Sequence, residues 1–153
     1  MNKALSLAVA ATLSCASLNS EAQTMIGKTT DVAAIANGDR MNAETLWAMG
    51  RIGGAAASPD GKTVVYQVGY YSVKQNKSHQ MLYTVSADGK KQHSLTTTAA
   101  SESDATWIDG GKRIAFLTGG QLWSMNADGT DRRQLTKSEI DIEGYIFSPD
   151  EKK

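Results

Sequence analysis

The sequence predicts an all-β fold: a partial β-propeller of two complete four-stranded blades plus the start of a third, preceded by a signal peptide and a short helix. Three observations support this prediction. An Asp-Gly turn motif recurs along the chain, short apolar segments separate the turns, and the spacing between equivalent residues is about 40 residues. Four short antiparallel strands in each unit of that length are typical of a propeller blade.

The composition excludes several classes of protein. The 153 residues carry 16 basic and 16 acidic side chains, so the formal net charge is zero and no excess of basic residues favours nucleic-acid binding. Hydrophobic residues make up 41% and charged residues 21%, which is typical of a globular chain. No apolar run reaches the roughly 18 residues that a membrane-spanning helix needs.

Residues 1–22 have the pattern of a secretory signal peptide. Lys3 gives a positive start, residues 4–13 are almost all small or apolar, and Ser20 and Ala22 are small residues at the cleavage site. Cleavage after Ala22 would leave a product that is secreted or periplasmic. The alternative is a buried core helix.

Cys15 is the only cysteine, and it lies within this signal. The mature chain would therefore have no disulfide, no thiol nucleophile and no cysteine metal ligand. A second interpretation makes Cys15 the lipid-modified first residue of a lipoprotein, although Leu13 lies one place late for that pattern.

A leader or linker at residues 23–40 has little periodicity, and a short helical segment is expected at 41–53. Asn42 is a suitable N-cap, Glu44 lies in the first turn, and glycines follow the run. Leu46 and Met49 would share a face that docks on a sheet. Trp47 is expected to be a packed or half-exposed anchor.

From residue 54 onward the chain repeats itself, which predicts blade 1 at 54–96, blade 2 at 97–136 and a truncated third blade at 137–153. The turn motif at 58–62 recurs at 107–112 and 147–152, and the Ala-Asp-Gly turn at 87–89 recurs at 127–129. The pairs at 82–83 and 95–96 recur 40 residues later, at 122–123 and 135–136. In the first unit a polar loop at residues 70–80 adds length. A single β-sandwich is the rival architecture, but it does not explain turns and strands that recur together.

The expected strands are short, with apolar residues that point to both faces. They are listed in chain order as 54–57, 63–68, 81–86, 91–95, 104–108, 113–117, 121–126 and 131–135. Ile114 and Phe116 alternate with Ala115 and Leu117, as expected of a sheet that is covered on both sides.

Several polar groups have a structural interpretation that outweighs a functional one. Glu139, Asp141 and Glu143 would share one face of a strand; they could clamp a substrate ammonium group, but a solvated strand between blades is the better interpretation. His79 and His93 have no cysteine or histidine cluster around them, so metal binding is not expected.

The remaining polar residues and the glycine pairs fit turns. Asp60, Asp109 and Asp150 recur because the turn favours an Asx residue, and the glycine pairs are turn glycines. The basic pairs at residues 90–91 and 132–133 are expected to face solvent.

The lead-in at residues 41–47, which runs directly into the first turn motif at 58–62, resembles the start of bacterial secreted dipeptidyl peptidases and acylaminoacyl-peptidase-like members of the prolyl oligopeptidase family of serine peptidases. The blade motif itself also resembles the propeller repeat of TolB. The resemblance covers residues 41–153. It implies a propeller that caps an α/β-hydrolase domain with a Ser, Asp and His triad, so that short peptides are cut and folded proteins are spared.

No Gly-x-Ser-x-Gly motif occurs in the sequence, so no catalytic residue is carried over, and no cofactor or metal site is expected. We therefore expect an N-terminal piece of a secreted serine exopeptidase, inactive alone, whose partners are peptide substrates and a C-terminal hydrolase domain. Nucleic acid and a transmembrane segment are not expected. The alternatives are a TolB-like periplasmic binding module and a truncated gene product without function.

Overall fold

The structure is a computed structural model, and it describes residues 41–150. The predicted signal peptide at 1–22, the alternative lipid site at Cys15, the leader at 23–40 and the final residues 151–153 lie outside the described residues.

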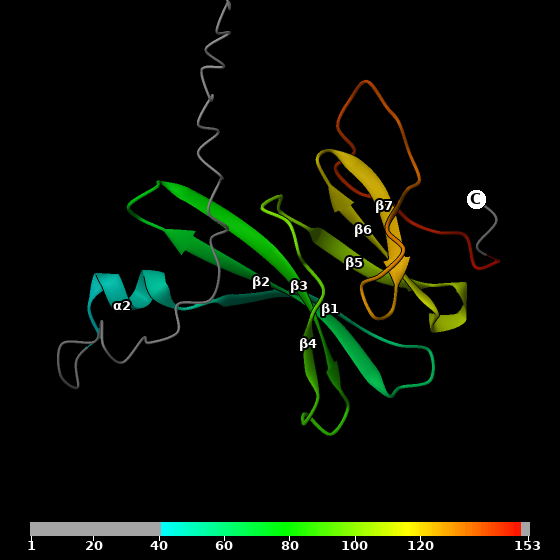
Figure 1. The fold of residues 1–153 in the computed structure, drawn as a ribbon, viewed down its shortest axis with the longest axis horizontal. Helices are drawn as coiled ribbons and strands as arrows, with labels where there is room; N and C mark the ends of the chain where they lie inside the picture. The colour runs from blue at the N-terminus through cyan, green and yellow to red at the C-terminus, as the bar shows by residue number, and fades with distance from the viewer. Residues whose placement is uncertain (1–40, 151–153) are drawn as a thin grey trace, which may run out of the picture.

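Two four-stranded antiparallel sheets make up most of the described chain (Figure 1). The first contains, in spatial order, β1 (Arg51–Ala57), β2 (Thr63–Ser72), β3 (Lys77–Ser86) and β4 (Gln92–Ser94); the second contains β5 (Ser103–Ile108), β6 (Arg113–Thr118), β7 (Gln121–Asn126) and β8 (Arg133–Gln134). A short helix α2 (Ala43–Ala48) precedes them, and the 3-10 turn η1 (Asp109–Gly111) joins β5 to β6. The all-β prediction is confirmed.

The repeated turns form through the side chain of their aspartate. The Asp60 carboxylate accepts a 2.7 Å hydrogen bond from the Ser58 hydroxyl and a 3.1 Å bond from the Lys62 backbone N–H. Gly61 then takes the left-handed conformation, with φ at 69°. The Ser58 hydroxyl bond, aided by the Lys62 N–H, lowers the pKa of Asp60. Asp60 is thus a turn-forming residue, as predicted.

The helix is shorter than expected, and its buried residue is a different one. Asn42 caps it as predicted, because its side chain accepts a 2.7 Å hydrogen bond from the Thr45 backbone N–H. The helix ends at Ala48 and β1 begins at Arg51, since residues 51–52 pair with the end of β2 instead of extending the helix. Thr45 faces the protein while Leu46 is exposed, so the predicted docking face through Leu46 is wrong.

The predicted polar loop at residues 70–80 is also wrong, because most of it extends the hairpin of β2 and β3. Tyr70 pairs with His79 across the two strands, and both side chains are buried. Tyrosines favour strands, and their pairing partners lie on the far side of a turn at 73–76. The continuation of the strand therefore depends on contacts that the local composition did not indicate.

The core of the described chain lies between the two sheets. Six fully buried residues form it, drawn from both sheets and the segment after β4: Val65, Leu82, Leu95, Ile114, Phe116 and Met125. The Trp107 indole N–H also donates a 2.9 Å hydrogen bond to the Ala56 carbonyl oxygen, which fixes β5 against β1. The four central residues of β6 are all buried, which confirms that its apolar residues are covered on both faces.

A buried ion pair joins the sheets beside this core, and we call it the Glu102–Arg132 joint. Glu102 is only 1% exposed, and its carboxylate accepts a 2.7 Å hydrogen bond from the Thr96 hydroxyl and pairs with Arg132. The Arg132 guanidinium lies 4.8 Å from the ring centroid of Phe116. Arg132 was expected to face solvent; that prediction is wrong, because its partner Glu102 lies 30 residues away in the sequence.

Burial is the largest influence on the Glu102 carboxyl. It raises the pKa above the ordinary value of 4.5, while the Thr96 hydroxyl and the Arg132 charge pull it part of the way back. A carboxyl with a raised pKa binds its proton more tightly in the folded state than in the unfolded state. Its contribution to stability therefore falls as the pH rises through the raised pKa.

Replacing Phe116 with alanine should lower the free energy of unfolding by about 3–5 kcal/mol, because the ring is fully buried and a cavity would remain. Urea unfolding monitored by circular dichroism measures the change. Ile146→Ala is the matched control: its side chain is 95% exposed, so the change should stay within about 0.5 kcal/mol. Equal losses in the two variants would contradict this account of the core.

Replacing Glu102 with glutamine should remove a pH-dependent part of the stability. Well below pH 4.5 the wild-type carboxyl is protonated in both states, and the stability difference between the two proteins should not change with pH. As the pH rises toward 7, the wild-type chain must hold a buried carboxylate, so its stability relative to Glu102→Gln should fall. Urea titrations of both proteins between pH 4 and pH 7.5 test this; a difference that grows in favour of the wild type would contradict it.

Candidate functional site

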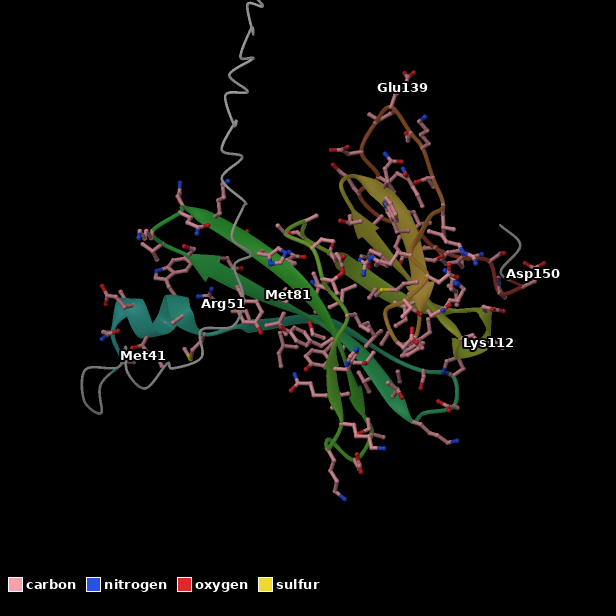
Figure 2. The ribbon with its side chains drawn as sticks, viewed as in Figure 1. Met41, Arg51, Met81, Lys112, Glu139 and Asp150 are labelled. Carbon is pink, nitrogen blue, oxygen red and sulfur yellow. The ribbon has the colours of Figure 1, made fainter. Side chains whose placement is uncertain are left out.

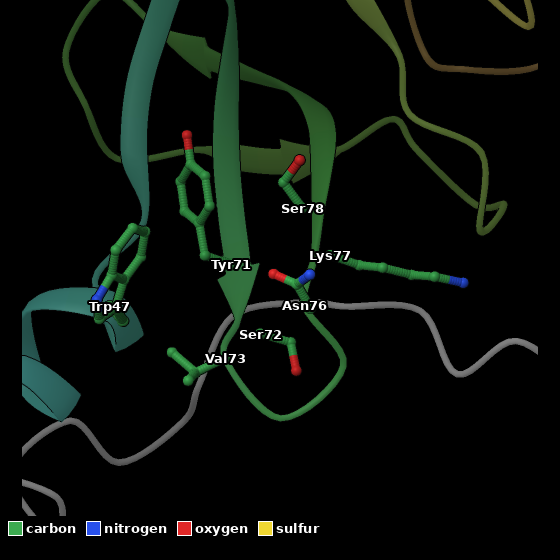
Figure 3. Close-up of a pocket in the computed structure, with 7 residues that line it drawn as sticks. All are labelled: Trp47, Tyr71, Ser72, Val73, Asn76, Lys77 and Ser78. Atoms are coloured by element: carbon green, nitrogen blue, oxygen red, sulfur yellow. The ribbon is translucent and has the colours of Figure 1, made fainter.

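A hollow of about 410 Å³ lies where α2 meets the outer part of the β2–β3 hairpin (Figure 3). Its lining combines two aromatic rings, one aliphatic side chain and several polar groups: Trp47, Tyr71, Ser72, Val73, Asn76, Lys77 and Ser78. The hairpin extension that replaces the predicted loop builds most of this lining. The site therefore depends on residues that the sequence pattern assigned to a polar connection.

Arg51 holds the aromatic wall of the hollow in place. Its guanidinium lies 5.0 Å from the ring centroid of Trp47 and 4.5 Å from that of Tyr71, and the two rings meet edge to face at 5.5 Å. Figure 2 shows Arg51 beside the helix. Trp47 is half-exposed, as the sequence predicted for an anchor residue.

The chemistry of this hollow is that of a binding surface. The aromatic rings offer an apolar wall, and Asn76, Ser72 and Ser78 offer hydrogen-bonding groups on the opposite side. Asn76 takes a left-handed backbone conformation, with φ at 49°, at the tip of the hairpin. The lining contains no carboxylate or imidazole, and its one charged side chain is Lys77.

A second hollow of about 610 Å³ opens between the two sheets at their turn ends. His93, Asp128 and Trp107 are among its lining residues, as is the turn residue Asp60. Hydrogen bonds from the Thr130 hydroxyl and backbone N–H lower the pKa of Asp128, with a smaller contribution from the charge of His93. Asp60 and Asp128 are thus each engaged in their own turn, which for Asp60 is the role that the sequence predicted.

The two histidines differ in burial. His79 is buried on β3, where its Nε2 lies 3.1 Å from the carbonyl oxygen of Ala100, whereas His93 is exposed on β4. His79 was placed in a polar loop, and the strand extension corrects this. Within residues 41–150 no group of three or more His, Cys, Asp or Glu side chains is placed to hold a metal ion.

The three acidic residues near the end of the described chain do not lie on a strand. Glu139, Asp141 and Glu143 are exposed in an irregular segment, and Figure 2 shows Glu139 at the tip of its loop. The predicted strand is not formed, because none of the strands described between residues 41 and 150 pairs with these residues. Instead, the Ile142 backbone N–H donates one 2.9 Å hydrogen bond to the Gly120 carbonyl oxygen.

Sequence reasoning missed the Glu102–Arg132 joint and the aromatic hollow. The joint had one sequence signal, an acidic residue six positions after the recurring Leu-Thr pair, but its partner could not be identified from spacing. The hollow had no sequence signal beyond Trp47, which was expected to be a packed or half-exposed anchor. No helix within the described range is long and apolar enough to cross a membrane.

Comparison with known proteins gives two kinds of similarity. No protein-family model matches the chain. Dipeptidyl-peptidase 5 of Porphyromonas endodontalis is 43% identical over 116 residues, which is 73% of this chain and 17% of that protein. Dipeptidyl-peptidase 5 of Porphyromonas gingivalis is 41% identical over 119 residues, which is 75% of this chain and 17% of that protein.

Among solved structures, an acylaminoacyl peptidase from Pyrococcus horikoshii matches with a TM-score of 0.51 and 14% identity, over 62% of this chain and 15% of that one. A TolB-like protein from Agrobacterium tumefaciens has a TM-score of 0.47 and 19% identity, over 57% of this chain and 34% of that one. The peptidase match shows a common fold alone. The chain is homologous to a region of dipeptidyl-peptidase 5 and spans about a sixth of the length of these relatives.

Proposed function

We propose that this chain is the N-terminal β-propeller segment of a secreted serine exopeptidase of the dipeptidyl-peptidase kind. The identity of 43% over 116 residues with a dipeptidyl-peptidase is the observation that carries the proposal. Under this proposal the two sheets are consecutive propeller blades, and the segment limits which peptides reach a catalytic hydrolase domain.

The packing of the sheets supports the propeller assignment. Each sheet has four antiparallel strands in chain order, and the second presents apolar residues on both faces. A blade within a propeller needs both faces apolar because it lies between two neighbours. The Glu102–Arg132 joint and the Trp107–Ala56 hydrogen bond would fix the angle between the blades.

The gating role is the part of the proposal that concerns what the segment does for the whole enzyme. The sequence contains no Gly-x-Ser-x-Gly elbow, so a nucleophile would come from a separate domain. A rigid, side-chain-filled set of sheets can exclude folded proteins from such a domain by size alone. Export through the residues 1–22 signal would place the enzyme where peptides from outside the cell arrive.

Export can be tested on the chain itself. Expression in a Gram-negative host should give a periplasmic product whose first residue is Gln23, because the signal peptidase reads the small residues at positions 20 and 22. Intact-mass measurement identifies that terminus. Ala22→Arg, which places a large charged residue at the cleavage site, should leave the uncleaved precursor; a wild-type product that retains Met1 in the cytoplasm would contradict the proposal.

The peptidase assignment can be tested on the longer protein that would contain this chain. It should release dipeptides from peptides with a free N-terminus and should fail on the same peptides when the N-terminus is acetylated. Release is measured by mass spectrometry, and the 153-residue chain alone, which should show no turnover, is the control. Turnover of acetylated peptides only would assign an acylaminoacyl specificity instead, and no hydrolysis of either would contradict the proposal.

A further inference from the structure

The second sheet has a large exposed leucine at the position where the first sheet has a buried one. Leu95, which follows β4, is 1% exposed, whereas Leu135, which follows β8, is 47% exposed. Two more large apolar side chains, Ile140 and Ile146, are exposed in the segment that follows. The side of the second sheet around Leu135 is therefore uncovered in the described chain.

Backbone hydrogen bonds show that the two leucines hold the same place in their sheets. The N–H groups of Leu95 and Thr96 both point to the Leu82 carbonyl oxygen, at 2.8 and 3.4 Å. Those of Leu135 and Thr136 point to the Leu122 carbonyl oxygen, at 2.8 and 3.3 Å. Every residue in the second set lies 40 positions after its counterpart.

The same shift identifies the residue that replaces Glu102. The Glu102 N–H donates a 3.0 Å hydrogen bond to the Gln80 carbonyl oxygen, and the Ile142 N–H donates a 2.9 Å bond to the Gly120 carbonyl oxygen. Ile142 is therefore the structural counterpart of Glu102. An apolar side chain stands where the first sheet has the carboxylate of the ionic joint.

Residues of the second sheet cover Leu95, and they show what a covering sheet must present. Gly129 approaches so closely that an added Cβ would lie 3.4 Å from the Leu95 Cδ2 atom. Arg132 completes the cover by donating a 3.3 Å hydrogen bond to the Leu95 carbonyl oxygen and by pairing with Glu102. A glycine turn and one long side chain thus close the first junction.

In the second sheet a neutral side chain, that of Gln121, accepts the hydrogen bonds of the polar groups around Thr136. Thr96 donates its hydroxyl hydrogen bond to Glu102, whereas Thr136 donates its 3.0 Å bond to the side-chain oxygen of Gln121. The Ser138 backbone N–H donates to the same Gln121 oxygen at 2.8 Å. The Ile142 side chain cannot pair with a guanidinium, so an arginine brought there would lose the buried partner that Glu102 gives to Arg132. The acidic neighbours of Ile142, Asp141 and Glu143, are exposed and do not replace that buried carboxylate.

We propose that the face around Leu135 and Ile142 docks a third four-stranded sheet of the same repeat, and that it selects a sheet with an apolar residue where the second sheet carries Arg132. This rests on the propeller part of the proposed function and not on peptidase activity. The first two units would then join through an ion pair and the second and third through apolar contact. Such a difference would fix the order in which similar units pack.

The shift of 40 residues allows a direct test. A second copy of residues 113–136 placed directly after Lys152 completes a third sheet, because Lys152 takes the place of Lys112. Four extended proteins vary two positions. Position 142 carries either isoleucine or the Ile142→Glu substitution, and the copy of Arg132 is either kept or replaced by leucine. Urea unfolding of all four, followed by circular dichroism, gives the coupling between the two positions.

The proposal expects leucine to be the more stabilising residue opposite Ile142 and the copied arginine to be the more stabilising one opposite Ile142→Glu. The effect of the leucine replacement on the unfolding equilibrium constant should differ at least ten-fold between the Ile142 and Ile142→Glu backgrounds. Coupling below two-fold, or a preference for arginine opposite Ile142, would overturn the proposal. Because no catalysis is measured, an inactive longer protein would leave this result intact.

A thiol-labelling measurement covers the case in which an extended chain folds poorly. In a Cys15→Ser background, Leu135→Cys should react quickly in the 153-residue chain and at least ten-fold more slowly in the extended leucine version. Val73→Cys, at the far end of the first sheet, should react equally in both. An unchanged rate at position 135, or protection that appears only in a dimer of the 153-residue chain, would overturn the proposal.

Discussion

Burial of both faces of β6 is the constraint on which the rest of the described structure depends. Ile114 and Phe116 pack into the core between the sheets, while Ala115 and Leu117 pack against the segment that carries Ile142. Burying a large apolar side chain contributes about 1.5–3 kcal/mol, so a strand with both faces covered supplies much of the stability of a small domain. Neither sheet could supply this burial alone, since each leaves one face for the other to cover.

The Glu102–Arg132 joint adds orientation to that apolar contact. A buried carboxylate loses its hydration, and its pairing with Arg132 and the Thr96 hydroxyl offsets that loss only in one geometry. Apolar surfaces tolerate small rotations, whereas an ion pair with a shared hydroxyl does not. We infer that the core supplies most of the attraction between the sheets and that the joint determines how they are set against each other.

The parts of the fold that the sequence predicted are those determined by local chemistry. The turn at Asp60 needs only a hydroxyl two residues before it and a glycine after it, and the cap at Asn42 needs only the next turn of helix. The parts that it missed depend on distant partners. Tyr70 joins a strand because His79 pairs with it, and Arg132 is half-buried because Glu102 lies across the junction. The aromatic hollow was missed for the same reason, since the hairpin extension that the sequence did not predict builds most of its lining.

A repeat whose junctions differ in chemistry is easier to assemble correctly than one whose junctions are identical. If every unit offered the same carboxylate and the same arginine, any unit could dock on any other with equal affinity. The first unit has Glu102 at the position where the second unit has Ile142, so the two units do not offer the same docking surface. The backbone hydrogen bonds at that position are the same in both units. The shared backbone pattern then maintains the spacing of the sheets, and the side chains at a single position decide which neighbour each sheet accepts.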